Sequence, residues 1–244
     1  MRALTAPELL RVWEEGRGRP LAERALLLLG CACPDEPRED LLSLSVGRRD
    51  ARLLRLREWT FGPWFTSLAR CPACGERLEL SFSTADVLVQ PEEEPREVLQ
   101  LSAEGYDVTF RLPTGADLAA LEGAREGDDA RDRLLERCLL SARRNGRSRP
   151  VGRLPATVLH AVVERMGEAD PQADVRTPLA CPACAHAWEA AFDIVSFFWT
   201  EIERWAYRTL QEVHVLARAY AWRESDILAL SPARRQLYLE MVHA

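Results

Sequence analysis

The sequence predicts an α+β, predominantly helical protein: a split four-cysteine zinc ribbon with an inserted small β-hairpin-plus-helices domain and long C-terminal helices. Two observations predict this fold class. The tetrapeptide Cys-Pro-Ala-Cys occurs at Cys71–Cys74 and again at Cys181–Cys184, and each copy leads into a strand-like alternation of apolar and polar residues. Most of the remaining chain carries apolar residues at the three-and-four spacing of helices.

Length and composition are those of an ordinary globular protein. The 244 residues are 47% hydrophobic, which is enough to bury a sizeable core. The net charge of −6 opposes a general affinity for nucleic acid, because binding to phosphates requires a basic surface. All 32 residues in the lysine and arginine class are arginine, which excludes Schiff-base chemistry and a P-loop lysine. The N-terminus has no apolar signal segment, and the apolar runs are too short to cross a membrane, so we expect a soluble cytoplasmic protein.

Residues 1–70 are predicted to form an N-terminal helical region. Apolar residues recur at helical spacing from Pro7 to Glu14 and from Pro20 to Gly30, and the break at Gly16 to Arg19 between them predicts a helical hairpin. A further helix is expected from Gly47 to Glu58, where leucines are interspersed among five arginines.

The first zinc knuckle and its strand are expected at residues 71–84, and an inserted α+β domain at residues 85–174. Within the insertion, alternation from Val98 to Ser102 and from Tyr106 to Leu112 predicts a β-hairpin with its turn at Ala103 to Gly105. The pattern then predicts helices around Leu118 and Leu121, through Leu134 to Leu139, and from Pro155 to Met166, with loops at Pro91 to Pro95, Gly127 to Asp129 and Asn145 to Arg153.

The second zinc knuckle and its strand are expected at residues 175–193, followed by a C-terminal helical region at residues 194–244. A stripe of apolar residues from Val195 to Tyr220 steps by three and four, which predicts a long helix. Such a stripe favours core packing, although its length also suits a seam with a partner helix. Ser231 followed by Pro232 predicts the start of a last helix.

The predicted metal ligands are Cys71, Cys74, Cys181 and Cys184, which would hold one structural Zn²⁺. Two-residue spacing lets both thiolates of one tight turn reach the same tetrahedral ion, and two such turns complete a four-thiolate site. Closing the intervening loop costs about 5 kcal/mol of chain entropy, whereas a structural zinc site contributes about 10 to 16 kcal/mol. The metal can therefore hold together a ribbon that is split by an inserted domain.

Other interpretations of the cysteine pairs are less favoured. A thioredoxin-type redox pair would open a helix, whereas both copies lead into strands. His186 could replace one cysteine, but four cysteines already complete the site, which favours an outer or packing role for this histidine. Ala185 stands where Gly75 stands in the first copy, although this position in a knuckle often needs the positive φ that glycine tolerates.

The sequence contains no Gly-rich phosphate loop, no GxSxG motif and no HExxH motif, and four thiolates would close the coordination of the metal. We therefore expect a protein that is not an enzyme and that acts by binding other proteins. Aromatic and arginine side chains are favoured at protein interfaces. The candidate contact residues, for which core packing is the alternative role, are Trp199, Trp205, Tyr220, Trp222, Arg234 and Arg235.

Several segments spread over nearly the whole chain form one recognisable combination. They are residues 46–51 with 53–58, the first Cys-Pro-Ala-Cys-Gly with its strand, residues 106–114, residues 170–174, the second Cys-Pro-Ala-Cys with Trp188, and Ser225–Leu228 with Leu230–Pro232 and Arg234–Arg235. In these segments the chain resembles the T4-type baseplate hub assembly chaperone family of contractile phage tails and phage-tail-like contractile injection systems. The resemblance implies a helper or minor component of baseplate assembly that binds baseplate or hub proteins in the cytoplasm or on the particle.

The alternative function is that of a zinc-ribbon regulatory protein that binds nucleic acid. The ribbon itself and the arginine-rich segment from Arg48 to Arg57 favour it. The negative net charge opposes it, and arginines interspersed with leucines are typical of an ordinary amphipathic helix.

Overall fold

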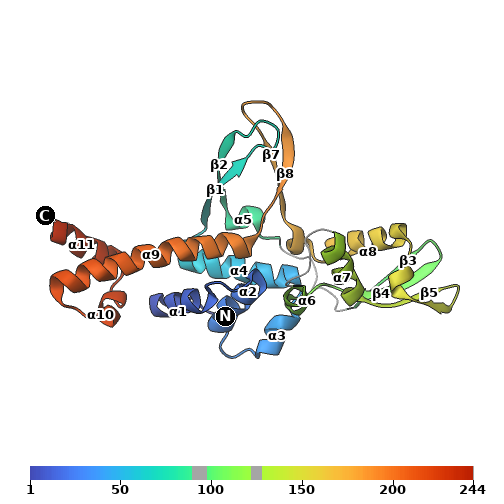
Figure 1. The fold of residues 1–244 in the computed structure, drawn as a ribbon, viewed down its shortest axis with the longest axis horizontal. Helices are drawn as coiled ribbons and strands as arrows, with labels where there is room; N and C mark the ends of the chain where they lie inside the picture. The colour runs from blue at the N-terminus through green and yellow to red at the C-terminus, as the bar shows by residue number, and fades with distance from the viewer. Residues whose placement is uncertain (90–97, 122–127, 244) are drawn as a thin grey trace. The chain divides into compact units, whose positions relative to one another are not determined.

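The computed structural model (Figure 1) describes residues 1–89, 98–121 and 128–243. The chain separates into two compact units. Unit 1 comprises residues 1–34 and 195–244, and unit 2 comprises residues 35–194. The α+β, predominantly helical class predicted from the sequence is confirmed. The predicted loop at Pro91 to Pro95 and residue Gly127 lie outside the described residues. Among the described helices, none has the length and apolar character that a membrane span requires.

Unit 1 begins with the predicted helical hairpin. Helix α1 (Ala6–Gly16) and helix α2 (Leu21–Ala32) lie on either side of the break at Gly16 to Arg19. The start of α1 is capped reciprocally: the hydroxyl of Thr5 accepts from the backbone N–H of Glu8, and the Glu8 carboxylate accepts from the N–H of Thr5 at 2.9 Å.

Helix α9 (Ile194–Tyr220) supplies the other part of the unit 1 core. Its predicted apolar stripe is less than a tenth exposed at Val195, Trp199, Ile202, Ala206, Thr209, Val213 and Leu216. A Cβ atom on Gly16 would lie 2.2 Å from a carbon of the Trp199 ring, so only glycine permits this approach. The guanidinium of Arg24 covers the same ring at 4.6 Å from its centroid. Most of the stripe is therefore core packing.

The chain ends in helix α10 (Glu224–Leu228) and helix α11 (Pro232–His243). The hydroxyl of Ser231 accepts from the backbone N–H of Arg234 at 3.3 Å, which confirms the predicted helix start. Arg235 lies buried and donates to the Glu212 carboxylate at 2.9 Å and to the carbonyl of Leu230 at 3.0 Å. This ion pair links α11 to α9.

Unit 2 contains helix α3 (Arg38–Ser43), helix α4 (Val46–Phe61) and two antiparallel hairpins. One hairpin pairs β1 (Trp64–Arg70) with β2 (Arg77–Ser83), and the other pairs β7 (Arg176–Ala180) with β8 (Ala187–Ala191). Figure 1 shows the two hairpins side by side.

Residues 64–70 form a strand, although the sequence predicts that they belong to the N-terminal helical region. Gly62 has a φ of 89° and ends α4, and Pro63 cannot continue a helix. The next residues are rich in aromatic and β-branched side chains, which favour a strand. Each knuckle is consequently preceded as well as followed by a strand, and strand β7 was likewise not predicted.

The inserted part of unit 2 contains more β-strands than the sequence predicts. Its sheet has the antiparallel order β3 (Val98–Ala103), β4 (Tyr106–Arg111), β5 (Leu139–Arg144) and β6 (Arg147–Arg149). The predicted β3–β4 hairpin is confirmed, with its turn at Glu104 and Gly105, whose φ angles are both positive.

The prediction was wrong for the second hairpin, because the expected helix ends at Cys138 and the expected loop contains strand β6. Helix α7 (Asp128–Cys138) gives way to β5, so that Leu139 and Ala142 face the core. Asn145 and Gly146 form the turn with φ angles of 50° and 76°. An Asn-Gly pair is the typical signal of a two-residue hairpin turn, and it was available in the sequence.

Helix α8 (Ala156–Ala169) packs on the sheet, and helix α6 (Gly115–Ala120) follows β4. The core of the insertion gathers one face of the sheet and one face of α8, including Val108, Phe110, Val158, Val162 and Met166. Burying this apolar surface is the main stabilising contribution of the insertion.

A buried carboxylate joins three parts of the insertion. Asp117 on α6 is 1% exposed and accepts from Arg111 at 2.5 and 2.9 Å and from Arg137 at 2.9 Å. Burial acts to raise the pKa of Asp117, but hydrogen bonds from Arg111 and Thr114 outweigh it and hold the pKa well below its usual range. The carboxylate is therefore ionised at neutral pH and fixes α6 to β4 and α7.

Two segments that lie far apart in the sequence meet at the start of α4. The backbone N–H of Gly47 donates to the Asp170 carboxylate at 2.9 Å. Asp170 is followed by a short 3₁₀ helix, η2 (Pro171–Asp174), which contains Gln172. The side-chain amide of Gln172 donates to the carbonyl of Val87 at 3.2 Å and accepts from the N–H of Val89 at 2.7 Å. Residues 170–172 thus join α4 to the segment that follows β2, where helix α5 (Thr84–Val87) lies.

The close approach at Gly47 generates a stability prediction. A Cβ on Gly47 would lie 2.0 Å from an Asp170 oxygen, so Gly47→Ala should lower the free energy of unfolding by about 1 to 3 kcal/mol through overpacking. Urea unfolding measures this difference. The matched control is Gly167→Ala inside α8, where no atom of the described residues outside that helix turn lies within 4 Å of the added Cβ. This variant should be neutral or stabilise by up to about 1 kcal/mol. Equal losses in the two variants would contradict the packing argument.

Candidate metal centre

The two knuckles have the same backbone geometry at the tips of their hairpins. In the first, the N–H of Cys71 donates to the carbonyl of Glu76 at 2.8 Å, and the N–H of Gly75 donates to the carbonyl of Cys71 at 2.9 Å. In the second, Cys181 donates to His186 and Ala185 donates to Cys181, both at 2.9 Å. The repeated tetrapeptide therefore forms the same tight turn twice.

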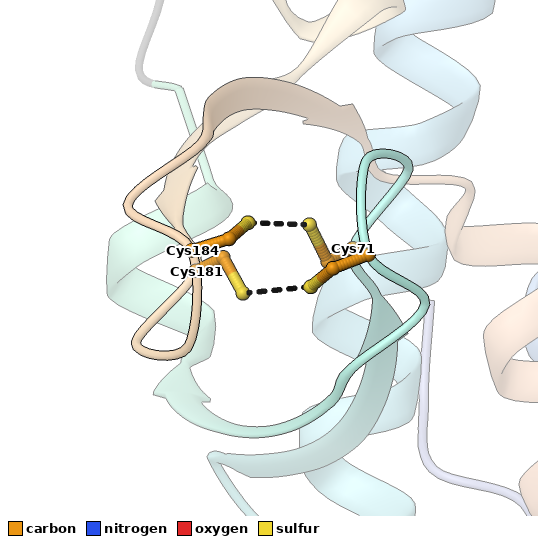
Figure 2. Close-up of side chains that lie close together, drawn as sticks. Cys71, Cys181 and Cys184 are labelled. Carbon is orange, nitrogen blue, oxygen red and sulfur yellow. Dashed lines mark hydrogen bonds between the residues drawn. The ribbon is translucent and has the colours of Figure 1, made fainter.

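The four cysteine sulfur atoms come together between these turns. All four lie within 4.8 Å of one another, with Cys71 and Cys184 3.7 Å apart and Cys74 and Cys181 3.5 Å apart. Figure 2 shows Cys181 and Cys184 on one loop facing Cys71 on the other. The first cysteine of each pair is buried and the second is exposed, so the two turns present the sulfurs in the same way.

The donor set fits a tetrahedral metal ion. Thiolates that bind zinc at about 2.3 Å in a tetrahedron lie about 3.8 Å from one another. The distances of 3.5 and 3.7 Å across the cluster are close to this value, and they are far longer than the S–S bond of a disulfide, which is about 2.05 Å. The four cysteines could therefore hold one metal ion with no position left open.

Electrostatics within the cluster favour a cation. Burial acts to raise the pKa of Cys71, but hydrogen bonds from the backbone amides of Cys74 and Ala73 lower it to about 6. The amide of Glu76 acts to lower the pKa of Cys74, yet hydrogen bonds with Cys184 and Cys181 raise it to about 12. Four sulfurs this close cannot all be thiolates without a compensating charge, and a bound metal ion supplies that charge.

The roots of the two hairpins, at the ends away from the cysteines, are joined by aromatic side chains for which the sequence predicted no role in the site. The rings of Phe65 on β1 and Phe82 on β2 are stacked with centroids 5.0 Å apart. Phe192, directly after β8, meets both rings edge-on at 5.6 and 5.5 Å. The strand alternation around Phe82 and Phe192 could have identified two of these three residues.

Arg57 supports this aromatic group from α4. Its guanidinium lies 3.8 Å from the Phe65 ring centroid and donates to the carbonyls of Gly62 and Trp64 at 2.6 and 2.8 Å. Its side chain is buried, with 2% of the residue exposed. Because this contact holds the first residue of β1 against α4, it fixes where the first hairpin leaves the helical part of unit 2.

The remaining predicted site residues take different positions. His186 lies outside the sulfur cluster, and its ring is stacked with that of Trp188 at 6.1 Å. In unit 1, Tyr220 and Trp222 are stacked at 4.7 Å and Tyr238 meets both rings. Trp205, Tyr220 and Trp222 are half-buried, and Arg234 is exposed, whereas Trp199 and Arg235 are each 4% exposed.

The arginine-rich segment that suggested nucleic-acid binding lies on α4, and several of its arginines are engaged within the protein. Arg49 donates to Asp50 at 2.7 Å and Arg52 donates to Glu36 at 2.6 Å. Arg57 is buried as described above, which leaves Arg48 and Arg55 exposed. The segment therefore presents much less positive charge than its sequence indicates.

Comparison with known protein families gives a match that covers most of the chain. The family model described as T4 bacteriophage base plate protein matches residues 25–199, a range that includes both cysteine pairs and the whole of unit 2. No curated protein and no solved structure matches the chain significantly.

The two knuckles differ in one residue, and this difference predicts a change in stability. Gly75 and Ala185 occupy the same turn position with φ angles of 77° and 58°. An L residue in this conformation costs about 1 kcal/mol, so Ala185→Gly should raise the free energy of unfolding by about 0.5 to 1 kcal/mol. Gly75→Ala should lower it by about 1 kcal/mol or more. Urea unfolding of both variants at fixed zinc concentration tests this; destabilisation by Ala185→Gly would contradict it.

Proposed function

The chain belongs to the family of T4 bacteriophage base plate proteins, and from this premise we propose that it is a non-enzymatic protein that assists or takes part in baseplate assembly. The particle would be a contractile phage tail or a phage-tail-like injection system. The protein would act through contacts with baseplate or hub proteins, as an assembly chaperone does.

The observation that carries this proposal is the family match over residues 25–199. The metal centre supports it, because four thiols that enclose one ion leave no coordination position for a substrate. Arg49, Arg52 and Arg57, three of the arginines that favoured the nucleic-acid alternative, are engaged in contacts within unit 2.

We propose that Cys71, Cys74, Cys181 and Cys184 bind one structural Zn²⁺. The hairpins β1–β2 and β7–β8 would be the halves of a split zinc ribbon, and residues 85–174 would be the domain inserted between them. When bound, zinc would supply fold stability, because it links two turns that lie far apart in the sequence.

For partner contacts we propose the aromatic and arginine residues of the C-terminal region. Tyr220 and Trp222, which are stacked, and Tyr238, which meets both rings edge-on, are half-buried, so each residue keeps some exposed surface. Arg234 is exposed beside it in sequence, and Leu237 and Met241 on α11 are 55% and 64% exposed. Trp205 adds a half-buried ring, while Trp199 and Arg235 are each 4% exposed and offer little surface for contact.

The zinc proposal predicts a metal content that depends on both cysteine pairs. Purified protein should contain about one equivalent of zinc. The double variant Cys71→Ser, Cys181→Ser should lose it and unfold at a lower temperature, because each half of the site loses a ligand. The control is Cys33→Ser, Cys138→Ser, which removes two buried thiols outside the cluster and should keep the zinc. Elemental analysis measures the zinc content of both variants. Zinc retained in the Cys71→Ser, Cys181→Ser variant would contradict a site shared by the two cysteine pairs.

The functional proposal predicts stable binding to a baseplate protein. Co-expression with the neighbouring baseplate genes and affinity purification should retain at least one of their products. Trp222→Ala and Arg234→Glu should weaken this retention by about tenfold each, which corresponds to about 1.4 kcal/mol. Arg38→Glu on α3 is the charge-matched control and should have no effect. If no baseplate protein is retained by the wild-type chain, the proposed function is wrong.

A further inference from the structure

We propose that the β5–β6 hairpin is a docking surface for an acidic segment of a protein partner. The inference rests on the proposed function in one respect: the partner is taken to be a protein. The surface consists of Arg144, Arg147 and Arg149, which we refer to as the arginine face.

The segment around the β5–β6 hairpin carries positive but no negative side chains. Between Leu139 and Val163 the sequence contains no aspartate or glutamate, and its arginines are Arg143, Arg144, Arg147, Arg149 and Arg153. All five are exposed, in a chain whose net charge is −6. Because guanidinium groups stay protonated at every physiological pH, this concentration of positive charge is permanent.

The strand register places three of these arginines on one face of the sheet. Arg144 pairs with Arg147 across the hairpin, and Arg149 pairs with Ala142, which is 1% exposed and belongs to the core of the insertion. Paired and alternate residues share a face, so the arginine face continues the core-facing side of the sheet toward its tip. Arg144 is held in place there by the ring of Tyr106, with its guanidinium 4.9 Å from the ring centroid.

The arginine face is not neutralised by the part of the chain that the structure describes. No described carboxylate forms an ion pair with Arg144, Arg147 or Arg149. The nearest acidic residue in the register is Asp107, which pairs with Arg143 on the opposite face and accepts from Ser102 at 2.6 Å. Like charges directly opposite one another destabilise a hairpin, so the pairing of Arg144 with Arg147 costs stability that an acidic ligand would restore.

An acidic protein segment fits this surface better than nucleic acid does. Single-stranded nucleic acid is usually bound by exposed aromatic rings among the basic residues. The aromatic residues of the described insertion, Tyr106 and Phe110, are 9% and 0% exposed, so neither can stack on a base. Carboxylates need only the guanidinium groups themselves, which bind them in a bidentate manner.

The test compares the full-length chain with two charge-matched variants. Arg147→Gln, Arg149→Gln removes two members of the arginine face. Arg208→Gln, Arg218→Gln removes two exposed arginines of α9 and changes the net charge by the same amount. The probes are a fluorescein-labelled poly-glutamate peptide and single-stranded and duplex DNA of matched length, at physiological ionic strength.

The wild-type chain and the α9 variant should bind poly-glutamate, and the hairpin variant should bind it about tenfold more weakly. Equal losses in both variants, no binding by the wild-type chain, or tighter arginine-dependent binding of DNA than of poly-glutamate would overturn the proposal. Co-purification with baseplate proteins distinguishes a failure of the docking surface from a failure of the proposed function. If the hairpin variant retains such a partner as well as the wild-type chain does, the docking surface is wrong although the function stands. If the wild-type chain retains none while poly-glutamate binding depends on the hairpin, only the function fails.

Discussion

The convergence of four cysteine sulfurs from two hairpins is the constraint on which the architecture of unit 2 depends. The pairs are separated by residues 75–180, yet all four sulfurs lie within 4.8 Å of one another. A separation of this size makes the contact costly in chain entropy. The cluster can persist only if the rest of unit 2 brings both hairpins to the same place, and the structure shows how it does so at their roots.

Two kinds of contact fix those roots. Phe65, Phe82 and Phe192 form one aromatic group from three strands or strand ends, supported by the buried Arg57. The polar contacts of Asp170 and Gln172 hold the start of α4 and the segment after β2 against the chain that leads into β7. Buried polar groups that are fully paired specify one arrangement, because any other leaves a donor or acceptor unsatisfied. These contacts therefore help to place both hairpin tips at the same site.

The buried groups that hold unit 2 together are separate from the exposed residues proposed for partner contacts. Phe65 and Asp117 are buried, and the sulfur cluster has one buried and one exposed cysteine in each pair. The groups that remain available are peripheral: the aromatic and arginine residues of the C-terminal helices in unit 1, and the arginine face of the insertion in unit 2. Under the proposed function, these two sets of residues would allow contacts with other proteins at more than one place.

Local patterns in the sequence determined most of the longer helices, the β3–β4 hairpin and the four metal-ligand candidates, because periodicity, capping residues and Cys-x-x-Cys spacing act over a few neighbouring residues. The Asn145-Gly146 turn was equally local, and its signal was available. The Gly62-Pro63 break before strand β1 was local as well. Only the tertiary structure decided that Gly47 requires glycine because Asp170 lies against it, and that Arg49, Arg52 and Arg57 are engaged within the protein. Each of these depends on a partner far along the chain or on burial, and burial is a property of the folded molecule rather than of any segment.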